Sequence, residues 1–521
     1  MKRHVGTALA ILIAALAAAP LAPAPAAAQM TLRVGSGGAD IAKLDPHRAT
    51  STNDKTVVGW MFNALVRFPP GSADPKTIEP DLAERWDRSP DGLTWTFHLR
   101  PGVKFHGSWG ELTAEDVAYS LKRAADPKRS SFAGAYTAIA DVVAIDPKTV
   151  RITLKHPVPS LLGLVANYHG GNIVSRKAAE ELGDKYAAQP VGTGPFAFAE
   201  HVTQQHVKLV AHEGYFRGRP KLDGVNLRFI PSDSGRELAF ASGELDLFYA
   251  KREQRWVTAA RRRPDTIVDI FSPDEFRTVH INRTIAPLDD VRVRRAIAHG
   301  ISVQEILRFV GTDVAIAGCS VVPPGYLGED CPAGGYKFDQ ARAKALLAEA
   351  GHGSGLTLKV VVSNISAQLP IMEVIQAQLG KIGIKLDMSV VDHPTYHAQI
   401  RTNASALVFY GAARFPVADS YLTEFYHSDA IVGRPTAITN FSHCTVADAE
   451  IVSARAEPDD AKQLALWKTA QQKIHEDVCA VPLFGLLQVW ARSPRLDLGY
   501  DFKGAMNLAP MLTEKTEVKA R

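Results

Sequence analysis

Short runs in which apolar and polar residues alternate recur along the chain, and this period of two is typical of β-strands with one buried face. Turn-forming residues separate several of the runs, for example at Ser89–Gly92 and Asp146–Lys148. The pattern predicts strands at Thr31–Val34, Thr94–Leu99, Val103–His106, Asp141–Ile145, Thr149–Leu154, Val207–Ala211, Gly243–Tyr249, Thr278–Asn282, Leu356–Val362 and Ile384–Val390.

Between these runs, apolar residues recur at the three- and four-residue spacing of amphipathic helices. Thr113 is a natural N-cap, and Asp116 occupies the capping-box position three residues later. The expected helices cover Thr56–Arg67, Leu112–Leu121, the stretch from Gly235 toward the strand at 243–249, Asp289–Ala298, Tyr336–Ala350 and Ile371–Ile382. Alternating strands and helices of this kind predict an α/β fold with mixed β-sheets.

One stretch, Gln189–Phe198, is unusually rich in glycine and proline. Gly192 and Gly194 permit backbone angles that other residues disfavour, while Pro190 and Pro195 fix their own φ angles. Such a segment can change the direction of the chain while its backbone conformation stays restricted. We interpret residues 189–196 as a crossing point between two lobes, with an ordinary surface loop as the alternative.

The length of 521 residues is too great for one core, so two or three domains are expected. A content of 46% apolar and 22% charged residues is that of a water-soluble globular protein. The 59 basic and 55 acidic residues give a formal charge of +4. This near balance gives no reason to expect a nucleic-acid partner or an anionic membrane partner.

The first 28 residues have the layout of a secretory signal peptide. Lys2 and Arg3 are followed by the apolar run Ala8–Ala19 and the small-residue site Ala26–Ala28. A membrane anchor is the alternative, but the run is too short to span a bilayer. Cleavage after Ala28 would release the mature protein into the periplasm.

Four cysteines, all beyond residue 318, suit an oxidising compartment. Because the loop between Cys319 and Cys331 is short and easily closed, we favour the disulfides Cys319–Cys331 and Cys444–Cys479 over the other two connectivities. A zinc site is the rival interpretation, but no C-x2-C spacing supports it.

Several motifs in register resemble one protein family. The strongest is DGLTWTFHLRPGVKFH at Asp91–His106, followed by LTAEDVAYSL at Leu112–Leu121. The others are Leu44–Pro46, Pro80–Trp86, Val191–Phe196, Asp290–Ile297 and Ala341–Gly351. Over nearly all of residues 31–500 the chain resembles extracytoplasmic solute-binding protein family 5, the peptide- and nickel-type binding proteins of ABC importers.

The resemblance implies a bilobed periplasmic binding protein of type II, in its large three-domain form, with a ligand cleft between the lobes. The implied segments are a signal peptide at 1–28, lobe I at 30–68, a satellite domain at 69–189, lobe I again at 190–275, lobe II at 276–485, and a return to lobe I at 486–521.

It also implies a function. The expected protein is a monomer that captures a peptide-like or anionic small molecule by hinge closure and delivers it to a membrane permease with separate ATPase subunits. No enzymatic activity, cofactor, metal or nucleic acid is expected.

The segment Tyr410–Leu422 is where the resemblance bears on the ligand. Peptide-binding relatives carry an Asp here that pairs with the amino terminus of the peptide, a few residues before an aromatic–Leu pair. Counting back from Tyr421 and Leu422 places Arg414 at that position, which would suit a carboxylate or phosphate. A shift of a few residues would bring Asp419 into the role instead.

Three further residues are predicted to line the ligand site. Tyr410 and Phe415 flank Arg414 and would supply apolar wall, with core packing as the alternative. Asn53 lies where the first lobe of the family meets its ligand, with a solvated loop as the alternative.

Other functions have weaker support. The chain has no G-x-S-x-G, H-E-x-x-H or P-loop motif, so a secreted α/β hydrolase remains only an alternative, as does a sensor or chaperone-like protein on the same fold. His393 and His397 have the i, i+4 spacing of metal ligands, but we expect solvent-facing imidazoles at a helix start. The basic run Lys251–Arg263 is expected to be a solvated face.

Overall fold

A nine-stranded mixed sheet runs through the computed structural model, which describes residues 30–158, 160–365, 367–433 and 439–519. The predicted signal peptide therefore lies outside the described residues. The strands pair in the order β16-β12-β17-β11-β1-β10-β9-β8, and β13 also pairs with β17. Their bounds are β1 Thr31–Ser36, β8 Phe196–Val202, β9 His206–Ala211, β10 Gly224–Phe229, β11 Leu247–Tyr249, β12 Ile267–Ile281, β13 Ala315–Ala317, β16 Leu407–Ala412 and β17 Ala480–Arg492.

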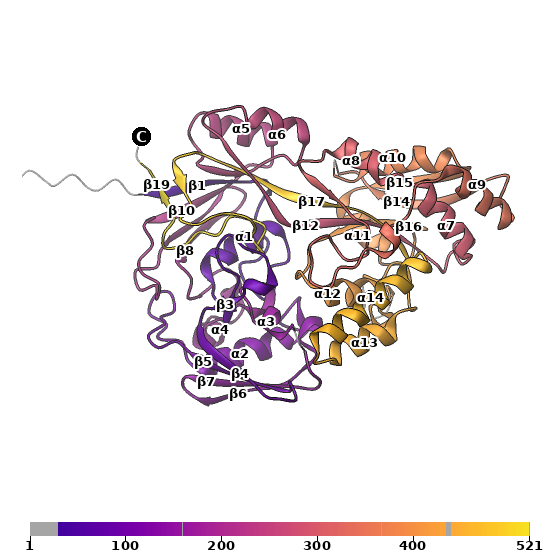
Figure 1. Ribbon diagram of the computed structural model, residues 1–521. Coiled ribbons are helices and arrows are strands. Elements are labelled where there is room, and N and C mark those ends of the chain that lie inside the picture. Colours follow the sequence, from indigo (N-terminus) through magenta and orange to yellow (C-terminus); the bar gives the residue numbers. More distant parts are fainter. Residues whose placement is uncertain (1–29, 159, 366, 434–438, 520–521) are drawn as a thin grey trace, which may run out of the picture.

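The two long strands β12 and β17 connect the halves of the molecule (Figure 1). They pair antiparallel from Ile267 opposite Arg492 to His280 opposite Ala480, with two register shifts along the way. We call the residues before β12, together with those after β17, lobe I, and the residues between β12 and β17 lobe II. The predicted boundaries at 275/276 and 485/486 fall within these strands.

Lobe I contains a second, four-stranded antiparallel sheet with the order β4-β5-β7-β6. One apolar core, which includes Leu32 of β1 and Phe97 of β5, joins this sheet to the larger one. The remaining elements of lobe I are β2 Val66–Arg67, β3 Glu79–Pro80, β4 Ala83–Arg88, β5 Thr94–Leu99, β6 Ile139–Asp146, β7 Thr149–Leu154, β18 Leu496–Asp497 and β19 Glu517–Val518, with helices α1 Thr52–Met61, α2 Ala114–Ala125, α3 Leu161–Leu164, α4 Arg176–Leu182, α5 Asp233–Ala241 and α6 Gln254–Ala260.

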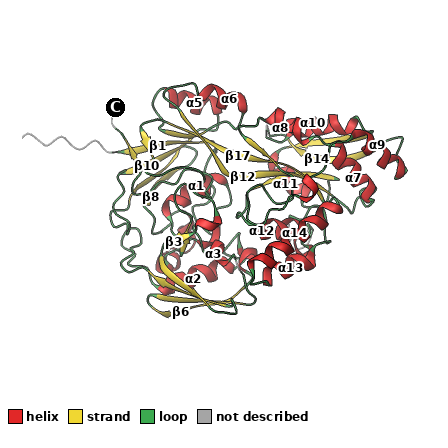
Figure 2. Ribbon diagram, viewed as in Figure 1, coloured by secondary structure: helices red, strands yellow, loops and turns green. Residues whose placement is uncertain are grey.

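Lobe II is richer in helices (Figure 2), and some of them pack against the parallel pair of strands β14 and β15. Its main core includes Val279 of β12 and Leu358 of β14. Its elements are α7 Val291–Gly300, α8 Val303–Val310, α9 Gln340–Glu349, β14 Leu356–Ser363, α10 Leu369–Gly380, β15 Ile384–Val391, α11 His393–Ile400, α12 Ala418–Tyr426, α13 Asp448–Ala456 and α14 Asp460–Glu476. Short 3-10 turns are η1 Pro75–Thr77, η2 Ala133–Tyr136, η3 His169–Gly171, η4 Gly183–Ala187, η5 Pro332–Gly334 and η6 Ser428–Ala430.

The glycine- and proline-rich segment runs from the end of η4 into β8, an edge strand of the larger sheet, so it lies within lobe I and is not a crossing between the two lobes as predicted. A Cβ on Gly194 would lie 2.5 Å from the carbonyl carbon of Met61, so only glycine allows this approach. His106, from the GVKFH motif, accepts a hydrogen bond from the Gly192 amide at 3.2 Å and bonds the Gly194 carbonyl oxygen at 3.0 Å. Two of the motifs behind the family resemblance therefore contact each other.

Most predicted elements are confirmed, including the capping box of α2, in which the Thr113 amide donates to Asp116. Several predictions were wrong: the strand expected at Gly243–Tyr249, for example, covers only Leu247–Tyr249. The helix expected at Thr56–Arg67 spans 52–61, because Ser51 caps it earlier and the chain is extended from Phe62. The strand expected at Thr278–Asn282 is only the end of β12. At Val103–His106 the structure has no strand, only an isolated bridge from Lys104 to Glu111.

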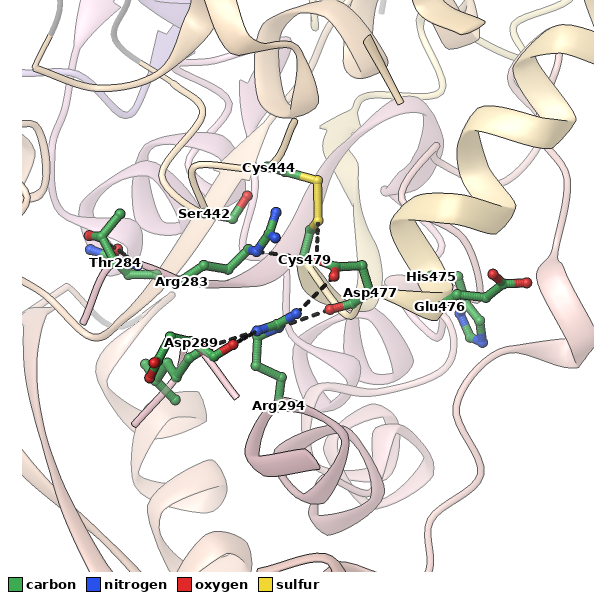
Figure 3. A network of polar contacts seen from close by, with 12 residues as sticks. Arg283, Thr284, Asp289, Arg294, Ser442, Cys444, His475, Glu476, Asp477 and Cys479 are labelled. Atoms are coloured by element: carbon green, nitrogen blue, oxygen red, sulfur yellow. Dashed lines mark hydrogen bonds and ion pairs between the residues drawn. A yellow bond between two sulfur atoms is a disulfide. The ribbon is translucent and has the colours of Figure 1, made fainter. Parts of the chain in front are cut away.

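Both predicted disulfides are confirmed, with Cα–Cα distances of 5.4 Å for Cys319–Cys331 and 5.8 Å for Cys444–Cys479. Next to the second disulfide, a network of ion pairs joins α7 to the start of β17 (Figure 3). The buried Arg294 guanidinium is 2.9 Å from an Asp477 carboxylate oxygen and donates to the carbonyl oxygens of Leu288 and Asp289. This network fixes the point where the chain enters β17.

We expect Arg294→Ala to lower the free energy of unfolding by about 2–3 kcal/mol, because Asp477 and two carbonyl groups lose a buried partner. Arg292→Ala, two residues earlier on the exposed face of α7, is the control and should cost less than about 1 kcal/mol. Denaturant unfolding with intact disulfides measures both. Equal losses for the two variants would show that the network does not stabilise the fold.

Candidate functional site

The two lobes touch through the loop that follows β16. Phe415 in this loop lies against Phe68 of lobe I, with 5.7 Å between the ring centroids. It also lies against Gly163 of α3, where a Cβ would be 2.1 Å from the Phe415 ring. The contact therefore depends on the absence of a side chain at position 163, and it brings the neighbouring Arg414 to the surface of lobe I.

On the lobe I side, the partly buried Lys55 of α1 lies near Tyr168, with its ammonium nitrogen 5.5 Å from the ring centroid. Tyr168 stacks on His169, whose Nε2 is shielded from solvent and has no hydrogen-bond partner among the described residues. Burial, together with the charge of Arg414, lowers the pKa of Lys55 to about 8. Burial also holds the pKa of His169 well below its usual value, so this imidazole is neutral.

On the lobe II side, Arg414 is held by α12. Its Nε donates to Glu424 at 2.5 Å, its Nη1 donates to the Ala413 carbonyl oxygen, and its guanidinium lies 5.4 Å from the centroid of Phe425. Burial alone would lower the pKa of Arg414, but Glu424 raises it above its usual value. The arginine is therefore charged at every physiological pH.

A second charged cluster lies where β12 leaves lobe I. Glu275 of β12 is 2.5 Å from Nη2 of Arg277 and 3.3 Å from Nη1 of Arg252, so one carboxylate is shared by two arginines. Burial raises the pKa of Glu275, but the two guanidinium groups outweigh it and the pKa is lowered. Glu275 and Glu424 both act on the pKa of Lys55, which places Lys55 within electrostatic range of both clusters.

The charges between the lobes are therefore unbalanced. Arg252, Arg277 and Arg414 share the two carboxylates Glu275 and Glu424, and Lys55 forms no ion pair with the described residues. A third carboxyl, that of Asp274, is buried beside Glu275, and burial together with the charge of Glu275 raises its pKa to about 7, so it carries only part of a negative charge at neutral pH. An excess of partly buried cations favours the binding of an anionic group, because burying like charges without a partner is costly.

Comparison with known proteins identifies the family. Residues 77–432 match the family model for bacterial extracellular solute-binding proteins, family 5 (Middle). The chain belongs to this family. Di/tripeptide-binding protein 2 of Pseudomonas aeruginosa is 31% identical over 475 residues, covering 84% of this chain and 86% of that protein.

Two solved structures extend the comparison. MoaA from A. tumefaciens R10, in complex with mannopinic acid, is 47% identical and covers 95% of this chain and 100% of its own, with a TM-score of 0.87. The ABC transporter-associated periplasmic binding protein DppA from Helicobacter pylori, in complex with the peptide STSA, is 28% identical and covers 94% and 98%, with a TM-score of 0.81.

These findings confirm the predicted bilobed type II fold and the predicted class of protein, a solute-binding protein that serves an ABC importer. They give no support to the hydrolase alternative, because the family consists of binding proteins. Within the described residues, no helix is both long and apolar enough to cross a membrane.

The structure brings three of the predicted ligand residues together. The ring centroids of Tyr410 and Phe425 are 6.0 Å apart, and the Phe425 ring also contacts Arg414. Phe415 follows Arg414 directly in the loop. The other two lie elsewhere. Asn53 accepts a hydrogen bond from Ser36 at 2.8 Å, whereas Asp419 pairs with Arg455 of α13 at 3.1 Å. A ligand role for any of the five stays a prediction.

Sequence reasoning missed Lys55, Tyr168, His169, Arg252 and the Glu275–Arg277 pair. Arg252 had been included in the run 251–263 that we expected to be solvated, and this was wrong for Arg252, because Glu275 and the turn of the chain into β12 shield it. An aromatic pair before two glycines, at residues 168–171, was the one local signal that marked a special conformation.

For His393 and His397, the expected helix start was correct and the expected solvent exposure was wrong. His393 begins α11 and His397 follows one turn later, but both side chains are partly buried rather than solvent-facing. The two rings bond each other at 3.1 Å, and His393 also bonds Ser363. Two surface hollows lie in lobe I and neither is lined by the residues between the lobes: one, of about 300 Å3, lies beside Trp109 between the start of α2 and α4, and the other, of about 310 Å3, lies beside Ile139 between α2 and β6.

We expect Gly163→Ala to separate the lobes, because its Cβ cannot share space with the Phe415 ring. Adding Phe415→Ala should remove this clash and let the lobes approach each other again. The radius of gyration from small-angle scattering should rise in the single variant and return in the double variant. Gly134→Ala, at a position with open space around its Cβ, is the control. An unchanged radius in Gly163→Ala would contradict the contact between the lobes.

Proposed function

We propose that this protein captures a small anionic solute, an organic acid of the opine type, between its two lobes outside the cytoplasm and delivers it to the permease of an ABC importer. The observation that carries the proposal is the excess of partly buried cations between the lobes. Lobe I contributes Lys55 to this group of cations, lobe II contributes Arg414, and the connecting region contributes Arg252 and Arg277.

The similarity to MoaA supports the ligand class. MoaA has mannopinic acid bound, and AgaA from the same source, 26% identical with a TM-score of 0.79, has agropinic acid bound. Opines of this type carry acidic groups on an amino-acid part and hydroxyl groups on a sugar-derived part. The cations would pair with the acidic groups, and the aromatic side chains between the lobes, such as Tyr168 and Tyr410, would contact the remainder.

An ordinary peptide is the second candidate, favoured by the similarity to a di/tripeptide-binding protein. A peptide offers an ammonium group at its amino terminus. Arg414 repels an ammonium group, and a mismatched charge in a partly buried site costs roughly 2–5 kcal/mol. Glu424 does not offer an alternative partner, because Arg414 already occupies its carboxylate.

The proposed function also implies a location, a partner and a division into domains. Export through the signal peptide at 1–28 would place a monomer in the periplasm, where it meets a membrane permease whose ATPase subunits are separate. The segments proposed for lobe I are 30–68, 190–275 and 486–521, with 69–189 as satellite domain and 276–485 as lobe II. A sensor role would use the same lobes but no permease.

Isothermal titration with a panel of solutes tests the ligand class. We expect mannopinic acid to bind with a dissociation constant in the micromolar range or below, about −8 kcal/mol or stronger. A dipeptide with a free amino terminus should bind at least tenfold more weakly. Tighter binding of the dipeptide would show that the site is built for peptides.

Arg414→Ala should weaken binding of the acid at least tenfold, which corresponds to about 1.4 kcal/mol, because the acid loses a charged hydrogen-bond partner. The melting temperature should stay the same, since Glu424 is exposed enough to be hydrated. Arg342→Ala, on the exposed face of α9, is the control. Equal affinities of wild type and Arg414→Ala would remove Arg414 from the site.

A further inference from the structure

Lys55 and Arg414 carry like charges and approach each other from opposite lobes. Arg414 stands in the loop that Phe415 anchors to Gly163, and Lys55 stands on α1, beside the Tyr168 ring. After burial, the charge of Arg414 is the largest influence that lowers the pKa of Lys55. The lobe contact therefore brings two cations into a region with little water to screen them.

The groups around Lys55 do not neutralise it. Glu424 of α12 is bound to Arg414, and Glu275 of β12 is bound to two arginines. Asp54, next to Lys55 on α1, accepts the Ala42 amide instead.

The remaining two neighbours of Lys55 are uncharged. Burial raises the pKa of Tyr168 and lowers that of His169, so both are neutral at physiological pH. His169 contributes Nε2, a shielded nitrogen with no hydrogen-bond partner among the described residues. The surroundings of Lys55 thus offer a cation and a polar nitrogen to a group that comes from outside the chain.

We propose that Lys55 and Arg414 jointly bind one acidic group of the ligand, so that the lobes close readily around an anion and resist closing without one. This inference rests on the proposed function and adds a mechanism to it. The acidic group replaces a repulsion across the lobe interface with two attractions. A neutral analogue of the same shape leaves the repulsion in place, so Lys55 determines specificity as well as affinity.

The pKa of Lys55 determines how closure of the lobes should depend on pH. In water a lysine has a pKa of about 10.4, whereas burial, together with the charge of Arg414 from the other lobe, lowers the pKa of Lys55 to about 8. Protonated Lys55 therefore opposes closure fully below pH 8, and the opposition fades as the pH rises toward the higher value. The ligand-free protein should close more at high pH. Affinity for the acid should fall over the same range, because neutral Lys55 no longer attracts it.

Two measurements on the mature full-length protein test this, with Lys55→Gln as the variant and Lys43→Gln, at an exposed position of lobe I, as the control. The first needs no ligand. Small-angle scattering at pH 7 and pH 10 should show that wild type and Lys43→Gln become more compact at the higher pH. Lys55→Gln should already be compact at pH 7 and should not change.

The second measurement compares mannopinic acid with its neutral amide by titration calorimetry at pH 7. Wild type should prefer the acid at least tenfold, and Lys55→Gln should lose most of that preference. If Lys55→Gln matches Lys43→Gln in both measurements, the inference is wrong even though the acid binds. If wild type binds no acid at all, the proposed ligand class fails, and the scattering result alone then decides whether Lys55 opposes closure.

Discussion

The pairing of β12 with β17 is the constraint on which the rest of the structure depends. These two strands belong to the sheet of lobe I at one end and to lobe II at the other, so the chain passes between the lobes along them. Arg294 and Asp477 fix the entry to β17, and the Cys444–Cys479 disulfide ties that entry to the loop before α13.

The same strands create the electrostatic problem that defines the site. Glu275 and Arg277 project from β12, and the chain leaving β11 brings Arg252 to them. Lobe closure then adds Lys55 and Arg414. Holding so many cations with so few carboxylates costs stability in the closed form, and an anionic ligand offsets that cost. A surplus of charge that weakens the empty closed form is thus what makes closure responsive to the solute.

The sequence predicted the elements and the family far better than the site. Helix α2 was predictable because Thr113 and Asp116 form a local capping box. The Cys319–Cys331 disulfide was predictable because its loop is short, and this left Cys444 and Cys479 as the second pair. Arg414 was found by its position before Tyr421 and Leu422. Lys55 was not, because a lysine in an amphipathic helix gives no local sign that Tyr168, more than a hundred residues later, will cover it. Glu275 and Arg252 are 23 residues apart, and only the register of β12 brings them together.

A crystal structure of the protein with bound mannopinic acid tests the central claim most directly. The account predicts that a carboxylate of the ligand lies within hydrogen-bonding distance of both Arg414 and Lys55, with Phe415 still seated on Gly163. It would be contradicted by a ligand that binds away from these two residues, for example in the hollow beside Trp109, or by a bound form in which the lobes do not touch.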